Sequence, residues 1–156
     1  MDRELTLKET VALAPAAPKN APRAPLHLYL IGGAAFIWSL LAVFDFLAII
    51  TRYAPYVGQL PEMTQVFIYE TPFWVWGLRA VAVFASLAGA VLLLRRRKVA
   101  VQVMALAATA TILSIGFSFA RPVPDDSMAV FGVCIVVVSV VLLHYAQTIA
   151  RRGVLS

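Results

Sequence analysis

Residues 26–50 read LHLYLIGGAAFIWSLLAVFDFLAII, a run of twenty-five residues whose only charged side chain is that of Asp45. About 20 mainly apolar residues are enough for an α-helix to cross the hydrocarbon core of a bilayer. Three further runs have the same character, at about 73–94, 100–120 and 128–149, and Arg79 is the only charge inside them. Because a helix satisfies its own backbone hydrogen bonds in lipid, we expect four transmembrane helices.

The composition of the whole chain agrees with this interpretation. Of its 156 residues, 62% are hydrophobic and 13% are charged, and the mean hydropathy is +0.86. A soluble domain is nearer half apolar and a quarter charged, so an ordinary soluble protein is excluded. We therefore predict an all-α membrane protein, a four-helix transmembrane bundle. The single cysteine, Cys134, excludes an internal disulfide and a cysteine-based metal site.

The chain before the first span has a different composition. Residues 14–25 contain four prolines and several alanines, and proline blocks the interior of a helix. We expect residues 1–25 to be a disordered, Ala/Pro-rich cytoplasmic tail, residues 26–150 to form the membrane bundle, and residues 151–156 to be a short cytoplasmic end. The first apolar run is long enough to stay in the bilayer, which favours an uncleaved anchor over a secretory signal.

The basic residues lie mainly on one side of the predicted membrane. Ten of the thirteen belong to the tail, to the turn at 95–98 and to the C-terminal end, and two belong to the other loops. This bias predicts a multi-pass membrane protein with both termini in the cytoplasm. Its main element is the topology signal Arg95, Arg96, Arg97 and Lys98. The net charge of +5 then reflects contact with the lipid bilayer, and we expect no nucleic-acid partner.

The loop at 51–72 is the largest element expected outside the membrane. Pro61 suits the first position of a helix, and Glu62 is favourable in its first turn. We predict a short outer interfacial helix of about two turns that ends before Pro72, followed by aromatic residues at the membrane surface. The residues assigned to this outer cap and aromatic belt are Met63, Phe67, Tyr69, Trp74 and Trp76.

Two charges lie inside the predicted spans. Asp45 is about 9 Å below the outer end of the first span, and Arg79 is about 10 Å below the outer end of the second. Since the depths match, we predict a salt bridge between them or a contact through one water, because an unpaired charge in the membrane costs several kcal/mol. Two interpretations stay open: a gate, proton site or ligand anchor, and a fixed pair that sets the register of the helices.

No cofactor or metal site is expected. A haem held by His27 and His144 would need two histidines at one depth, but His27 is at the edge of its span and His144 is about 9 Å inside. We expect His27 to be interfacial and His144 to be hydrogen-bonded. Small and hydroxyl residues recur on the third span, among them Ala107, Thr111, Ser114 and Ser118, and predict close helix packing.

No catalytic set is recognisable in the chain. The sequence has no HExxH motif, no P-loop and no dinucleotide-binding fingerprint. The predicted loops are also too small to hold an enzyme site. We therefore expect a protein that is not an enzyme, with no catalytic residues.

Three segments resemble those of a known family. They are residues 37–46 (IWSLLAVFDF), residues 71–74 (TPFW) and residues 87–97 (LAGAVLLLRRR). Together they resemble a family of small four-span bacterial inner-membrane proteins, largely uncharacterised, whose members are sometimes labelled sugar transporter. The resemblance covers about residues 28–120. It implies a bacterial inner membrane and places Asp45 in the family's pattern.

Two functions fit these observations. The first is a non-catalytic accessory or interaction protein that associates with itself or with a larger membrane complex. The second is a small-solute (sugar-like) transporter. Because four helices seldom enclose a transport path alone, the second function would require an oligomer.

Overall fold

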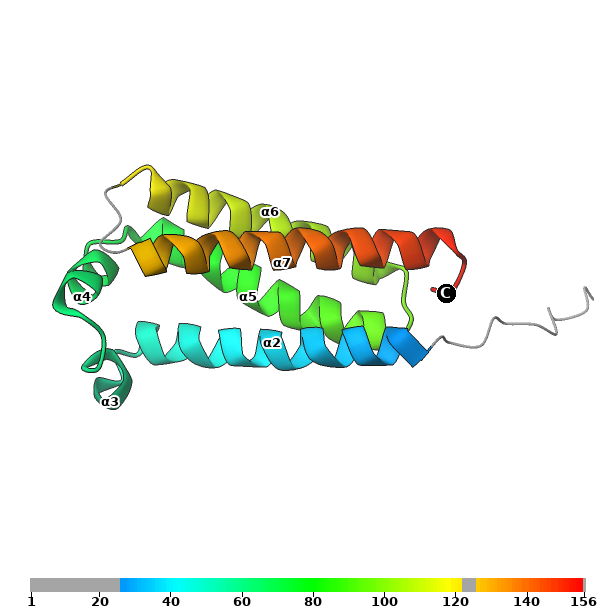
Figure 1. Cartoon of the computed structure of the whole chain (residues 1–156), viewed down its shortest axis with the longest axis horizontal. Helices are drawn as coiled ribbons and strands as arrows, with labels where there is room; N and C mark the ends of the chain where they lie inside the picture. The colour runs from blue at the N-terminus through cyan, green and yellow to red at the C-terminus, as the bar shows by residue number, and fades with distance from the viewer. Residues whose placement is uncertain (1–25, 122–125, 156) are drawn as a thin grey trace, which may run out of the picture.

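The computed structural model of the chain describes residues 26–121 and 126–155, and within them it is an all-α membrane bundle. The predicted tail at 1–25 lies outside the described residues. Four long helices run side by side, and two short ones cover one end (Figure 1). The elements in chain order are α2 (Leu26–Ile50), α3 (Ala54–Val57), α4 (Glu62–Tyr69), α5 (Phe73–Leu94), α6 (Val99–Phe119) and α7 (Asp126–Arg151).

All four long helices are long and apolar enough to cross a membrane. The bounds of α2 and α5 match the predicted spans, and α6 begins and ends one residue early. The last helix, α7, extends two residues beyond the prediction at each end. Its first turn holds Asp126 and its last turn holds Arg151, and these charges suit the helix dipole, so polar residues continue the helix past its apolar run.

The helices pack in chain order, α2 on α5, α5 on α6 and α6 on α7. Helices α5 and α6 approach closely at Gly89 of α5, where an added Cβ would lie 2.7 Å from Cγ of Met104. One face of α6 buries small residues, among them Ala107, Thr111 and Ser114. The predicted packing role of this small-residue stripe is therefore confirmed, because such residues let helices approach closely.

We call the end that carries the 95–98 turn and the C-terminus the basic end. Its interior is a closed apolar cluster, in which Leu28, Leu93 and Ala100 are fully buried. After α7 the chain reverses at Gly153, whose φ is +71°, and Val154 and Leu155 enter this cluster. The sequence analysis treated these last residues only as a cytoplasmic end, and it did not predict that they complete the core.

Arg96 connects this C-terminal segment to the α5–α6 turn. It has a φ of 57°, in the left-handed region, and its Nε donates a 3.0 Å hydrogen bond to the carbonyl oxygen of Val154. One member of the predicted topology signal therefore also holds the chain end in place.

We call the opposite end, covered by α3 and α4, the capped end (Figure 1). The predicted interfacial helix is present as α4, which follows Pro61 and ends before Pro72. The turn after α2 passes through Arg52, with a φ of 53°, and leads into the short helix α3, which the sequence analysis did not predict. The predicted loop is thus two helices.

The predicted cap and belt residues take different positions. Phe67 is buried, whereas Met63 is 67% exposed. Tyr69 lies under the guanidinium of Arg52, at 4.9 Å. Of the two predicted belt tryptophans, Trp74 packs against the ring of Phe117 at 4.6 Å between centroids.

An ion pair ties α4 to the end of α6. Arg121 Nη2 lies 3.0 Å from Glu70 Oε2, and its guanidinium also stacks 5.0 Å from the centre of the Phe67 ring. The cap is therefore attached to the bundle from both sides, by the α2–α3 turn and by Arg121.

Candidate functional site

A pocket of about 630 Å³ extends from the capped end past the middle of the bundle. Side chains from all six described helices line it, from Leu60 and Thr64 near the cap to Ala35 and Met104 deeper in the bundle. The volume is in the range that holds a small ligand. Most of the lining is apolar, so its charged residues stand out. We call it the capped-end pocket.

Asp45 lines the pocket from α2, and its hydrogen-bond partner belongs to the cap. The hydroxyl of Tyr56, on α3, donates a hydrogen bond to Asp45 Oδ1. The ring of Tyr56 also meets Phe44 edge to face, at 6.1 Å between centroids. The bond to Asp45, partial burial and the negative charge of Asp45 together raise the pKa of Tyr56 to about 12. The phenol therefore stays protonated at neutral pH and remains a donor.

Arg79 reaches the same pocket from α5. Its Nη2 donates a 3.3 Å hydrogen bond to Oγ of Ser118 on α6, and its guanidinium lies 5.1 Å from the ring centre of Trp76. A guanidinium has five N–H donors, so one long hydrogen bond leaves most of them unused within the described residues. Arg79 is thus oriented by its neighbours while its donors remain largely available.

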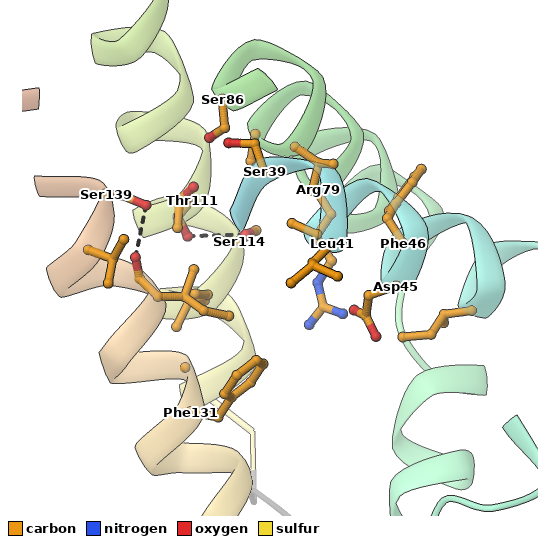
Figure 2. A pocket seen from close by; sticks show the side chains of 18 of the residues that line it. Ser39, Leu41, Asp45, Phe46, Arg79, Ser86, Thr111, Ser114, Phe131 and Ser139 are labelled. Atoms are coloured by element: carbon orange, nitrogen blue, oxygen red, sulfur yellow. Dashed lines mark hydrogen bonds between the residues drawn. The ribbon is translucent and has the colours of Figure 1, made fainter. Parts of the chain in front are cut away.

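The structure brings Asp45 and Arg79 to one site but not into direct contact. Figure 2 shows both charged groups pointing into the pocket, close to each other. Their charged atoms do not come within the 4.0 Å of an ion pair. The predicted direct salt bridge is therefore absent, although the matched depth was right. Asp45 is instead hydrogen-bonded to Tyr56 of the cap, and Arg79 is hydrogen-bonded to Ser118 of α6. A contact through one water stays a prediction.

Several hydroxyl groups line the deeper wall of the pocket. Those of Thr111 and Ser139 donate to carbonyls of their own helices, at 2.8 Å each. The hydroxyls of Ser39 on α2 and Ser86 on α5 also line the pocket (Figure 2), and neither makes a hydrogen bond to another described residue. The hydroxyls of these two serines are therefore the hydrogen-bond donors of the deeper wall that have no partner among the described residues.

The two histidines lie apart from this pocket. The ring of His27 packs edge to face on Tyr145 at the basic end, with centroids 6.1 Å apart. His144 is exposed on α7, and its backbone carbonyl, not its ring, accepts a bond from Thr148. The expected hydrogen bond of the His144 side chain is therefore not formed with any described residue. Within the described ranges no group of three or more His, Cys, Asp or Glu could hold a metal ion.

Sequence reasoning found the two charged residues and missed their partners. Tyr56 comes eleven residues after Asp45, on the far side of the left-handed turn at Arg52, so no helical spacing links them. Ser118 was assigned only to a packing stripe. A useful signal would have been the short Pro-Tyr segment at 55–56, directly above an intramembrane carboxylate.

Comparison of the chain with known protein-family models, with curated proteins and with solved structures finds no match in any of the three. The site therefore has to be interpreted from its own geometry. It presents a carboxylate and a guanidinium that share a mainly apolar pocket without a direct ion pair, which is an arrangement suited to anchoring a polar ligand.

Proposed function

We propose that this integral membrane protein is not an enzyme and binds a small solute in the capped-end pocket, as the binding element of a small-solute transporter. The observation that carries the proposal is the pair of separated charges, Asp45 and Arg79, inside a pocket of about 630 Å³. Charged groups within a span are costly and usually mark a ligand or ion site. A purely structural pair would be expected to close into a direct salt bridge.

The closed apolar cluster at the basic end supports the same proposal. It blocks the bundle on that side, because Leu28, Leu93 and Leu155 fill the interior. A solute would therefore reach the pocket from the capped end or from the side. Transport across the membrane would require a second conformation in which this cluster opens, which is the alternating-access requirement.

We further propose that the basic end faces the cytoplasm of a bacterial cell. The bias of ten basic residues to two supports this orientation. The capped-end pocket would then open toward the outside of the inner membrane. A single-cysteine reporter in the loop between α3 and α4, labelled in intact cells with an impermeant reagent, tests this orientation.

The test of the proposed function is solute binding and uptake with charge-neutral variants. Asp45→Asn keeps the size of the side chain, Arg79→Gln shortens it but keeps an amide donor, and each removes one charge. We expect each to weaken binding roughly tenfold or more, the effect of losing one charge-assisted hydrogen bond. Asp126→Asn and Arg52→Gln are matched controls, because neither residue lines the pocket. Uptake that is unchanged in Asp45→Asn and Arg79→Gln would contradict the proposal.

A second candidate function is an accessory or interaction protein, and α7 favours it. This helix packs on α6 alone along most of its length, and its opposite face exposes Val133, Val137 and Val141. Such a face suits contact with a second copy of the chain or with a larger membrane complex. An oligomeric transporter would use the same face.

The mass of the complex in mild detergent separates these possibilities. Whole multiples of 17.0 kDa would indicate self-association and favour the transporter. A second protein at fixed stoichiometry would favour the accessory role.

A further inference from the structure

We infer that the capped-end pocket takes a zwitterionic amphiphile, a molecule with a cationic and an anionic group at one end and an apolar chain at the other. This inference rests on the proposed function, because it names the class of solute for the same pocket. The headgroup lies at the level of Asp45 and Arg79, and the chain extends toward the middle of the bundle.

The two charges at the head of the pocket determine the headgroup. Asp45 has one oxygen bonded to Tyr56 and a second one available, and Arg79 has a single long bond to Ser118. A cationic group beside Asp45 and an anionic group beside Arg79 would satisfy both residues at once. A ligand with one charge would leave the opposite residue without a counter-charge in a medium of low dielectric constant.

The deeper wall of the pocket suits an apolar chain. Helices α2 and α7 contribute Ala42, Ile135 and Val138 to it. The hydroxyls of Thr111 and Ser139 are bonded to their own helices, so they offer no free donor to a ligand. The hydroxyls of Ser39 and Ser86 are the exceptions. They provide a test, because binding of an apolar chain does not require their hydrogen bonds, whereas binding of a fully polar solute does.

The seam between α2 and α7 gives such a molecule a way in. These helices pack on α5 and α6 and share a core with each other only at the basic end. Toward the capped end, Leu41 of α2 and Phe131 of α7 line the pocket and are also 60% and 56% exposed. Side chains that face both the pocket and the surface show that the pocket reaches the lipid-facing side of the bundle.

The position of the charges fits entry from one leaflet. Asp45 lies within about 10 Å of the end of α2, and Arg79 lies within about 10 Å of the start of α5. A lipid of the leaflet at the capped end has its headgroup near that level and its chain pointing to the midplane. It can therefore enter the seam without turning over.

The test uses three probes on the purified full-length protein in a non-ionic detergent. Lysophosphatidylethanolamine is a single-chain zwitterion, glycerophosphoethanolamine has the same phosphodiester headgroup without the chain, and lysophosphatidylglycerol has the chain with an anionic headgroup. Native mass spectrometry counts the molecules retained per chain. We expect lysophosphatidylethanolamine to bind at one per chain and to be preferred over each of the others by roughly tenfold or more.

Two pairs of variants separate the headgroup from the chain. Asp45→Asn and Arg79→Gln should reduce retention of lysophosphatidylethanolamine, whereas Asp126→Asn should not. Ser139→Phe fills the deeper wall, and its neighbour Val140→Phe, on the exposed face of α7, is the matched control. Ser139→Phe should reduce retention and Val140→Phe should not. The double variant Ser39→Ala, Ser86→Ala should leave retention unchanged, which keeps the test valid if Ser139→Phe fails to fold.

Other outcomes overturn the inference in distinguishable ways. Binding of glycerophosphoethanolamine that depends on Asp45 and Arg79, and is lost in the double serine variant, would show that the ligand is a water-soluble zwitterion. The proposed function, binding of a small solute in this pocket, would then stand, and the inference that the ligand is an amphiphile would be wrong. If lysophosphatidylglycerol is retained as well as lysophosphatidylethanolamine, the pocket does not select a zwitterionic headgroup, and this part of the inference is wrong. If no probe binds, and solute uptake is unchanged in Asp45→Asn and Arg79→Gln, the inference and the proposed function are both wrong.

Discussion

The two ends of this bundle use the same four helices in opposite ways. At the basic end, Leu28, Leu93 and Ala100 close the interior completely, and the chain returns after Gly153 to add Val154 and Leu155. At the capped end the helices enclose a pocket of about 630 Å³ that holds two charges. The basic end is a closed apolar core, and the pocket extends from the capped end to Met104 at the edge of that core.

The side chains explain the difference. Apolar residues at the basic end satisfy one another by contact, so nothing is gained by leaving space there. At the capped end, Asp45 and Arg79 cannot be buried among apolar side chains without partners. Tyr56 and Ser118 hold them apart instead of letting them close into a salt bridge. Both charged groups therefore remain in the pocket without a direct ion pair between them.

The largest expected effect on stability is at the basic end. Leu93→Ala should lower the free energy of unfolding by about 2–3 kcal/mol, because it leaves a cavity in a closed cluster. Unfolding in detergent followed by circular dichroism measures it. Leu106→Ala, on the exposed face of α6, is the control and should change little. Similar losses at both positions would mean that the basic end is not a closed core.

The C-terminal segment should have a smaller effect. Leu155→Ala removes a buried side chain from the same cluster, but a chain end relaxes more easily than a helix interior. We expect a loss of about 1–2 kcal/mol in the same unfolding assay. No loss would show that the C-terminal segment is not part of the core in the membrane.

The bond between the cap and Asp45 should be visible by titration. The pKa of Tyr56 is about 12 in the folded protein, above the ordinary value of 10.0. A raised pKa means that the stabilisation is complete below pH 10 and is lost as the pH rises from 10 to 12. Asp45→Asn should return the pKa of Tyr56 toward 10. The difference in tyrosinate absorbance from a Tyr56→Phe variant isolates this residue, and an unchanged pKa in Asp45→Asn would exclude the bond.

Much of this fold could be predicted from the sequence, and part of the site could be. Helix α2 was found to the residue, because long apolar runs and their depth depend on local composition. Asp45 and Arg79 stand out for the same reason. Tyr56 could not be found as the partner of Asp45, because it reaches Asp45 across a left-handed turn. The burial of Val154 could not be found either, because this residue reaches the core across a second left-handed turn. Such reversals depend on tertiary packing and leave no periodic signal.

The smallest expected effect is at the deeper wall of the pocket. Ser86→Ala should change the free energy of unfolding by less than about 0.5 kcal/mol, because its hydroxyl makes no hydrogen bond to a described residue. Unfolding in detergent checks this value. A loss above about 1 kcal/mol would indicate that this hydroxyl is bonded and that the wall is closed there.

The most direct test of the contrast between the two ends is thiol labelling at two positions on one face of α5. Ser86 lines the pocket, and Ala90, one turn further toward the basic end, is fully buried. Single cysteines are placed at each position in a Cys134→Ala background and treated with a small, polar thiol reagent. Our account predicts that Ser86→Cys is labelled, that Ala90→Cys is not, and that a bound ligand slows labelling at Ser86→Cys. Equal labelling at the two positions, or none at either, would contradict it.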